Sequence, residues 1–334
     1  MGRRFIVIAL IALILFTVYY VFFLKNPRVQ SAKETIIIIP PGTTVTALTD
    51  SLSAHHLIRS RFSFMLAART LGAVKKLHAG MYRIAPGLSN VKIISRLTGS
   101  EYALILRATF PEGITMYRAA SIAHEKLGLD STIFLKFAKD SGFLHSLGVP
   151  DKVKTGEGYL FPDTYEFILS ADPKGLVMRM VKRWKTIAMD SIYKKSNEAT
   201  LSIEQVMTLA SIVEAEAKLP AERDTIASVY LNRLKIGMAL DADPTVQYGL
   251  HLTRPITHED IQVPNPYNTY LNSGLPPGPI CNPGAASIRA VLDPAQTKYL
   301  YFVARRDGSG GHYFSRTMAE QEQMIRRSNA NAAE

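Results

Sequence analysis

The sequence predicts an α+β protein carried on a single N-terminal transmembrane helix. Three observations support this fold class. A charge-free apolar run covers residues 5–24, a strand–helix–helix–strand pattern follows over residues 34–98, and helical periodicity mixed with short β-branched runs continues over residues 99–330. About 300 residues follow the apolar run, which is the length of two domains of ordinary size, so we expect two domains outside the membrane.

Residues 5–24 are predicted to cross a membrane, with residues 1–4 as a cytoplasmic tail and residues 25–33 as a linker. At about 1.5 Å per residue such a helix covers the roughly 30 Å hydrocarbon core, and Tyr19 and Tyr20 suit an interface. A cleaved signal peptide is the alternative, although its apolar region would be shorter. Lys and Arg flank both sides of the run, so the orientation rests on the large C-terminal part, which favours a cytoplasmic N-terminus.

Composition restricts the partners. The formal net charge is +11, which suits nucleic acid, anionic lipid or an anionic polymer outside the cell. No run of Lys and Arg with interleaved aromatics, zinc knuckle or helix-turn-helix pattern occurs, so no nucleic-acid partner is expected. The single cysteine, Cys281, allows no internal disulfide, which fits a bacterial envelope protein as well as a cytosolic one.

Strand and helix signals predict a small first domain over residues 34–98. Strands are predicted over 34–39 and 80–84, and helices over 45–55, 60–71 and 91–97. A Pro-Pro-Gly turn ends the first strand, and a Pro-Gly turn follows the second. A βααβ unit of this size suggests a recognition module.

The second region is predicted to be mixed. A strand is expected over 104–110, followed by a Pro-Glu-Gly turn and then by helices over 115–127, 131–140, 172–196, 202–219 and 221–236. Residues 240–283 are dense in Pro, Gly, Asn, Asp and Tyr without clear periodicity, and a loop-rich stretch of this length usually carries function. A helix over 284–292, strands over 298–304 and 311–315, and a helix over 317–328 close the chain.

Glu214 is the first candidate for chemistry. It lies about 80° from the apolar stripe of the helix predicted over 202–219, and Glu216 lies a similar angle to the other side, so the two carboxyls should not share one site. Met207 and Ala210 precede Glu214 at helical spacing, with no Lys or Arg one turn earlier. Apolar surroundings disfavour the charged carboxylate, and a protonated Glu is what a general acid requires. An ordinary surface Glu is the alternative.

Other candidate sites are weaker. Residues 307–311, Asp-Gly-Ser-Gly-Gly, resemble a nucleophile loop in composition, but Asp-Gly between two strands signals a hairpin turn. The eight His residues form no ligand pattern at helical spacing, and no phosphate-binding or dinucleotide loop occurs, so neither a metal nor a cofactor is expected.

Four segments combine aromatic rings with amide and carboxyl groups: 157–165, 241–249, 266–270 and 273–280. Ring faces stack on a pyranose while the polar groups pair with its hydroxyls and N-acetyl amides, so together the segments suggest a sugar-binding cleft. A structural role for each, such as an Asp-Pro turn at residues 243–244, is the alternative.

Six segments stand out in order along the chain: Ser211-Ile-Val-Glu-Ala-Glu216, Arg223-Asp224, Asn232-Arg-Leu234, Asp243-Pro-Thr-Val-Gln-Tyr-Gly249, Tyr267-Asn-Thr-Tyr270 and Gly274-Leu-Pro-Pro-Gly278. Together they resemble the motifs of the YceG-like family of endolytic murein transglycosylases. The segment Glu157 to Tyr165 resembles the upstream motif of that family. Residues 34–98 resemble its LysM-like subdomain, and residues 99–330 its catalytic domain.

This resemblance implies cleavage of the β-1,4 bond between N-acetylmuramic acid and N-acetylglucosamine inside peptidoglycan strands. The muramic 6-hydroxyl would attack C1 and leave a 1,6-anhydro end, with Glu214 as the catalytic acid. An internal nucleophile makes the second carboxylate of ordinary glycosidases dispensable. The resemblance further implies substrate-binding roles for Asp243, Thr245, Gln247, Tyr248, Tyr267, Asn268, Thr269, Glu157 and Asp163. Glu216 is set aside and is expected to face Arg223.

By the same resemblance, the enzyme would be a single-pass protein of the bacterial inner membrane, with its catalytic domain in the periplasm. It would terminate nascent strands beside peptidoglycan synthases and division proteins. Two alternatives stay open. A muramidase using water would need a second carboxylate, for which Asp163 and Asp243 are candidates. A non-catalytic glycan-binding protein would keep the aromatic segments and not need Glu214.

Overall fold

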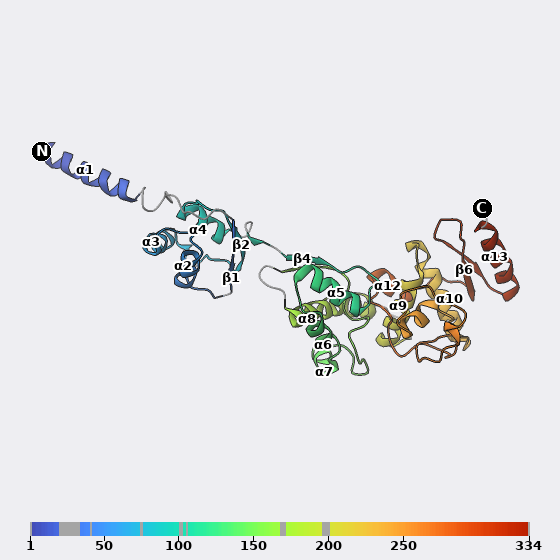
Figure 1. Cartoon of the computed structure of the whole chain (residues 1–334). Helices are drawn as coiled ribbons and strands as arrows, with labels where there is room; N and C mark the ends of the chain where they lie inside the picture. The colour runs from blue at the N-terminus through green and yellow to red at the C-terminus, as the bar shows by residue number, and fades with distance from the viewer. Residues whose placement is uncertain are drawn as a thin grey trace. The chain divides into compact units, whose positions relative to one another are not determined.

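The structure, a computed structural model, describes residues 2–19, 34–40, 42–73, 76–99, 103–104, 106–167, 172–195 and 201–332. It has the mixed α and β content that the sequence predicts, and it divides into two compact units (Figure 1). The first consists of residues 1–107 and 166–171, and the second of residues 108–165 and 172–334.

Helix α1 (Gly2–Tyr19) begins the first unit. Within the described ranges, no helix has both the length and the apolar character that crossing a membrane requires. The predicted transmembrane segment runs past Tyr19, so residues 20–24 and the predicted linker 25–33 lie outside the described residues.

A three-stranded sheet forms the rest of the first unit with three helices. The elements in chain order are β1 (Thr35–Ile39), α2 (Val45–Ala54), α3 (Arg61–Thr70), β2 (Gly80–Ile84), α4 (Asn90–Thr98) and β3 (Ala103–Leu104). The predicted βααβ order is therefore confirmed. Strand β2 lies between β1 and β3, antiparallel to both. Alternate residues of β1, such as Ile37 and Ile39, are buried against the helices, as period-two side-chain alternation requires.

The strand predicted over 104–110 is wrong as a single element. Leu104 pairs with Met81 in the first unit, whereas β4 (Leu106–Thr109) pairs with β5 (Thr164–Phe167) in a separate two-stranded sheet. The sequence pattern records β propensity on both sides of residue 105 but does not show where pairing partners change.

The second unit is mainly helical. Its helices are α5 (Met116–Leu127), α6 (Ser131–Ala138), α7 (Ser141–Ser146), α8 (Pro173–Trp184), α9 (Ile203–Glu216), α10 (Arg223–Lys235), α11 (Asp243–Gly249), α12 (Ala285–Leu292) and α13 (Met318–Asn331). The helix predicted over 172–196 is α-helical only as far as Trp184 and continues as a π-helix to Ile192 and a 3₁₀ turn to Lys195.

Helices α9, α10 and α12 pack together in the core of the second unit (Figure 1). Strands β6 (Tyr301–Ala304) and β7 (His312–Ser315) form an antiparallel hairpin that packs with α13. In its loop, Asp307 Oδ1 accepts hydrogen bonds from the backbone N–H and the hydroxyl of Ser309. The turn predicted for residues 307–311 is therefore confirmed.

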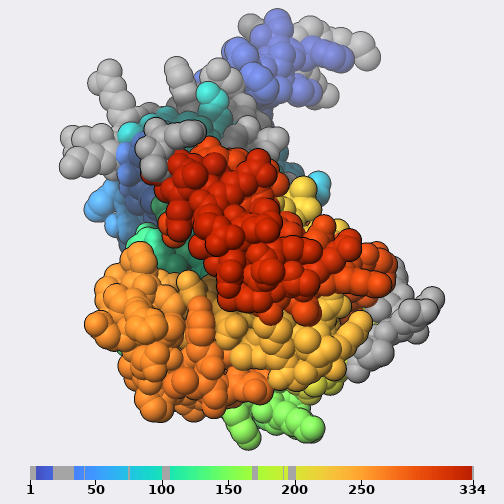
Figure 2. Space-filling model, turned by 90° about the vertical axis from the view of Figure 1, so that its right-hand side faces the viewer, coloured from blue at the N-terminus to red at the C-terminus, as the bar shows by residue number. Residues whose placement is uncertain are grey.

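The region 240–283 is less irregular than predicted. It contains α11 and a short 3₁₀ turn, Asp260–Gln262. Pro244 in the first turn of α11 was a helix-start signal that the density of turn-forming residues obscured. Figure 2 shows this region, in orange, exposed over a broad area of the surface.

Candidate active site

Helix α9 places Glu214 in its last turn. Ser202 caps the helix, since its hydroxyl accepts a hydrogen bond from Gln205 N while the Gln205 side chain accepts one from Ser202 N. Val206, Leu209, Ala210 and Val213 are fully buried and anchor the helix in the core. Glu214 is thus held on a rigid element just before the chain leaves the helix.

The Glu214 carboxylate accepts three hydrogen bonds from two neighbouring helices. Arg223 Nη2, at the start of α10, lies 3.2 Å from Oε1. Gly284 N and Ser287 Oγ, at the start of α12, lie 3.0 and 2.7 Å from Oε2. The side chain is only 6 % exposed. The carboxylate therefore sits at a helix N-terminus, where free N–H groups favour negative charge.

The prediction that apolar groups surround the Glu214 carboxyl is wrong. Its neighbours along the helix, Met207 and Ala210, are buried as expected. The carboxyl group itself, however, meets a guanidinium, a hydroxyl and a backbone N–H rather than apolar groups. These donors come from α10 and α12, so the spacing of residues within α9 carries no sign of them.

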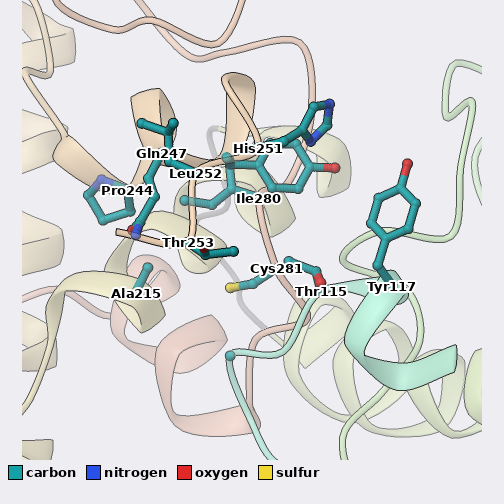
Figure 3. A pocket seen from close by; sticks show the side chains of 12 residues that line it. Thr115, Tyr117, Ala215, Pro244, Gln247, His251, Leu252, Thr253, Ile280 and Cys281 are labelled. Carbon is teal, nitrogen blue, oxygen red and sulfur yellow. The ribbon is translucent and has the colours of Figure 1, made fainter. Parts of the chain in front are cut away.

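A cavity of about 580 Å³ lies at the C-terminal end of α9, where Ala215 lines it (Figure 3). Gly113 and Ala215 are part of its lining. Ala215 follows Glu214 in the chain, and a Cβ added to Gly113 would lie 3.6 Å from Glu214 Cγ. The rest of the lining includes Thr115 and Tyr117 at the start of α5, Cys281, and Pro244, Gln247 and Tyr248 of α11. A cavity of this size is typical of sites that bind a small ligand or one or two sugar rings.

Two of the predicted binding residues, Gln247 and Tyr248, line this cavity. The Tyr248 ring lies 5.0 Å from the Tyr267 ring and 6.5 Å from the His251 ring. The ring of Tyr117, on α5, lies 6.5 Å from the His251 ring. The cavity therefore has an aromatic wall of the kind that stacks on a pyranose. Sequence reasoning missed Tyr117 and His251, because no motif marks them.

Three other predicted binding residues are buried and bonded within the chain. Thr269 Oγ1 lies 2.9 Å from Thr245 Oγ1 and accepts a hydrogen bond from Ala242 N at 3.0 Å. Asn268 Nδ2 donates to the carbonyls of Ile261 and Val263. Thr245, Asn268 and Thr269 are at most 1 % exposed. These contacts fasten α11 to the loops that follow it.

Asp243 lies near Glu216, whose carboxyl feels its charge, rather than near Glu214. Tyr270 Oη donates to Asp243 Oδ1 at 2.5 Å, and Tyr230 Oη donates to Glu216 Oε1 at 3.1 Å. Burial raises the pKa of Glu216 to about 7; the charge of Asp243 adds to this rise, and the Tyr230 hydrogen bond opposes it. The expected contact between Glu216 and Arg223 is wrong, because Arg223 contacts Glu214 instead.

The two acids of the upstream segment lie in different settings. Glu157 is 2 % exposed and accepts hydrogen bonds from Met116 N, Asn282 Nδ2 and Tyr248 Oη. Burial raises its pKa to about 8, although all three hydrogen bonds oppose the rise. Asp163 instead forms an ion pair with Arg183 at 2.7 Å, and its side chain is 37 % exposed. Glu157 thus supports the aromatic wall through its hydrogen bond with Tyr248.

The chain is similar to known proteins over most of its length. A model of the YceG-like family matches residues 37–327. A Bacillus subtilis protein named endolytic murein transglycosylase is 34 % identical over 317 residues, which cover 89 % of this chain and 86 % of that protein. A Streptococcus pneumoniae protein of the same name is 27 % identical and matches over 82 % of this chain and 55 % of that protein.

A solved structure is also similar. A crystal structure of a YceG-like protein from Listeria monocytogenes shares 30 % sequence identity and superposes with a TM-score of 0.61. The match covers 88 % of this chain and 100 % of that chain. The similarity therefore extends over both units of the molecule rather than over one motif.

Proposed function

Because the chain belongs to the YceG-like family, we propose that it is a peptidoglycan lytic transglycosylase that cuts within glycan strands. The observation that carries this proposal is a cavity with an aromatic wall whose lining includes two neighbours of Glu214: Ala215, which follows it in the chain, and Gly113, which packs on its side chain. Relatives named endolytic murein transglycosylase support the substrate class.

In the proposed reaction, Glu214 gives its proton to the glycosidic oxygen as the bond from that oxygen to C1 of N-acetylmuramic acid breaks. The 6-hydroxyl of the same sugar bonds to C1, and its proton returns to Glu214. Ser287 and Gly284 both donate hydrogen bonds to Glu214 Oε2, while Arg223 is the single donor to Oε1 among the described residues. Oε1 is therefore the oxygen with room for the transferred proton.

No water is consumed in this reaction, and the second carboxylate that an ordinary glycosidase uses as nucleophile or base is not needed. The internal hydroxyl is already held near C1, which gives it a high effective concentration. One carboxyl can then act first as acid and later as base. Asp163 is paired with Arg183, and Asp243 lies with Glu216, so neither is positioned as a partner of Glu214.

The experiment is digestion of purified peptidoglycan by residues 26–334, followed by mass spectrometry of the fragments. We expect products ending in 1,6-anhydro-N-acetylmuramic acid from internal cuts. Reducing ends would instead identify a muramidase that uses water. Binding of glycan without any cleavage would identify a non-catalytic binding protein.

We extend the proposal to the location of the enzyme. The charge-free run over residues 5–24, preceded by Arg3 and Arg4, supports a single anchor in the bacterial inner membrane with the catalytic region outside the cytoplasm. From there the enzyme would act on newly made strands beside peptidoglycan synthases and terminate their elongation. The test is carbonate extraction of membranes: the full chain should stay in the membrane pellet, and residues 26–334 should not.

The first unit would serve as the recognition module of the anchored enzyme, as its resemblance to a LysM-like subdomain suggests. Its βααβ order supports this proposal. Glycan pull-down with the full chain and with residues 99–334 tests it, because loss of the module should weaken binding to insoluble peptidoglycan.

A further inference from the structure

A second cavity, of about 530 Å³, lies at the N-terminal end of α9. Residues from three segments supply most of its lining: the segment 152–159, the first two turns of α9, and residues 277–279. It shares no lining residue with the first cavity, which Ala215 lines at the other end of the same helix. The catalytic unit therefore has two separate hollows along α9.

The two cavities adjoin at the aromatic wall. Tyr248 lines the first cavity and Tyr267 the second, and their rings are 5.0 Å apart. Glu157 lines the second cavity and accepts a hydrogen bond from Tyr248 Oη at 3.3 Å. A Cβ on Gly278 would lie 3.5 Å from Tyr267 Oη, so the hydroxyl end of Tyr267 lies against the segment 277–279. A ligand stacked on this wall in the first cavity is therefore next to the second.

The spacing suits a substituent of a sugar. Ala215 lines the first cavity and Thr208 the second, and these residues are seven positions apart on α9, which is roughly 10 Å along the helix axis. An extended peptide of four residues reaches about 13 Å. N-acetylmuramic acid carries such a peptide, the stem peptide, on its lactyl group. A stem peptide on a sugar in the first cavity can therefore reach the second.

The charges of the second cavity favour an anionic ligand. Lys152 and Lys154 line it with exposed side chains, and neither forms an ion pair with another residue in the described ranges. Burial raises the pKa of Glu157 to about 8, so this acid is mainly uncharged near neutral pH. Glu204, in the first turn of α9, is the remaining acid of the lining. Two cations and one anion suit a ligand that has carboxylates and a single amine.

The stem peptide has this chemistry. It contains an acidic residue and ends in a carboxylate, and before cross-linking it also has a free amine. The glycan itself is uncharged once the lactyl carboxyl group is amide-linked to the peptide. A further sugar of the strand would therefore leave Lys152 and Lys154 without partners.

The cavity is also formed in advance. Gly158 has a φ of +84°, and a Cβ there would overlap Pro279, so the segment 152–159 is packed closely on the segment 277–279. Tyr159 lines the cavity, and its buried hydroxyl has no hydrogen-bond partner among the described residues. The cavity therefore has fixed walls and an unused hydrogen-bond donor.

We propose that the second cavity binds the stem peptide of the sugar held in the first cavity, with Lys152 and Lys154 pairing with its carboxylates. This inference rests on the proposed function, because it concerns the peptidoglycan strand that the enzyme cuts. It makes the enzyme selective for strands that still carry their peptides.

The test compares kcat/KM on two soluble, uncross-linked substrates: strands that carry stem peptides and strands from which an amidase has removed them. The wild-type chain should favour the peptide-bearing strands about fivefold, which is the size expected for two exposed ion pairs. In Lys152→Gln/Lys154→Gln the ratio should fall to about one. Lys152→Arg/Lys154→Arg keeps both charges and should restore most of the preference.

Lys126→Gln/Lys136→Gln is the matched control. Both lysines are exposed, on α5 and α6, they line neither cavity, and their loss changes the net charge by the same amount. This control should keep the wild-type ratio. A wild-type ratio of one, or an unchanged ratio in Lys152→Gln/Lys154→Gln, would overturn the inference and leave the proposed function standing.

A second measurement does not depend on turnover. Isothermal titration of the Glu214→Gln chain with the two kinds of strand gives their affinities without cleavage. The peptide-bearing strands should bind more tightly, and adding Lys152→Gln/Lys154→Gln should remove the difference. Equal affinities in Glu214→Gln would contradict the inference. Absence of cleavage of either strand by the wild-type chain would instead overturn the proposed function.

Discussion

Arg223 and Glu214 form an ion pair between α10 and α9, with Nη2 and Oε1 3.2 Å apart and both side chains largely buried. Arg223 Nε also donates to Ser287 Oγ at 3.1 Å, and Ser287 in turn donates to Glu214. The three side chains therefore close a ring of hydrogen bonds that fixes the orientation of the carboxyl group. Groups held in this way are the part of a site most sensitive to substitution.

Arg223→Ala should lower kcat by about 100-fold, because the hydrogen-bonded ring no longer orients the Glu214 carboxyl group. It should also destabilise the fold by about 2 kcal/mol, because it leaves a buried carboxylate without its cation. Urea unfolding and turnover of the same preparation measure the two effects. Arg118→Ala is the matched control, since Arg118 pairs with Glu125 at the surface, where both side chains are about half exposed. That change should alter stability by less than about 1 kcal/mol. Equal effects of the two substitutions would contradict the role of Arg223.

Ser287→Ala should reduce kcat by about tenfold and stability by about 1 kcal/mol, since it removes the 2.7 Å hydrogen bond to Glu214 Oε2. Steady-state kinetics on peptidoglycan would show the loss in kcat with little change in KM. Ser309→Ala provides the comparison, because Ser309 lies in the exposed hairpin turn. A loss of activity in Ser309→Ala would instead support the nucleophile-loop interpretation of residues 307–311.

Stability should decrease as the pH rises from about 4.5 to about 8, because of Glu157. Its pKa in the folded chain is raised from 4.5 to about 8, so over this range the unfolded chain binds fewer protons than the folded one. Glu157→Gln cannot ionise, so its stability should change less over the same range. Its amide oxygen can accept the hydrogen bonds from Met116 N and Asn282 Nδ2, and its amide nitrogen can donate to Tyr248 Oη. At pH 8 the stability of the variant should exceed that of the wild type by about 4 kcal/mol. Thermal unfolding from pH 5 to pH 8 measures the difference, and parallel curves for the two proteins would contradict it.

Thr269→Val should cost about 1–2 kcal/mol of stability while leaving KM nearly unchanged. Thr269 Oγ1 is buried and bonded to Ala242 N and Thr245, so the change leaves a buried N–H without its acceptor. Chemical denaturation and KM on isolated glycan strands measure the two quantities. A large rise in KM in a protein of normal stability would show that Thr269 binds the sugar, as its motif implies.

Much of the fold could be predicted from local patterns. The caps at Thr44, Ser60, Ser89 and Ser202 start helices within one or two residues of the predicted positions. Short elements such as α7, β5 and α11 were not predicted, because four to seven residues carry too little periodicity. The split between β3 and β4 depends on a change of pairing partner, which is a tertiary property.

The site was predictable only in part. Glu214 stands out from its place in an apolar helix and from its motif. Arg223 and Ser287 reach it from 9 and 73 positions away in the chain, and no local pattern records such contacts. Residue type alone also could not separate Tyr248, which lines the cavity, from Asn268, which is bonded to backbone carbonyls.

The most direct test is the product of peptidoglycan cleavage by the wild-type chain and by Glu214→Gln, analysed by mass spectrometry at matched protein concentration. We expect 1,6-anhydro ends from internal cuts by the wild type, and a loss of at least about 1000-fold in Glu214→Gln, because the amide can neither give nor take the proton. Glu216→Gln, which changes the neighbouring acid bonded to Tyr230, should retain cleavage. Undiminished formation of anhydro ends by Glu214→Gln, or reducing ends from the wild type, would contradict the assignment.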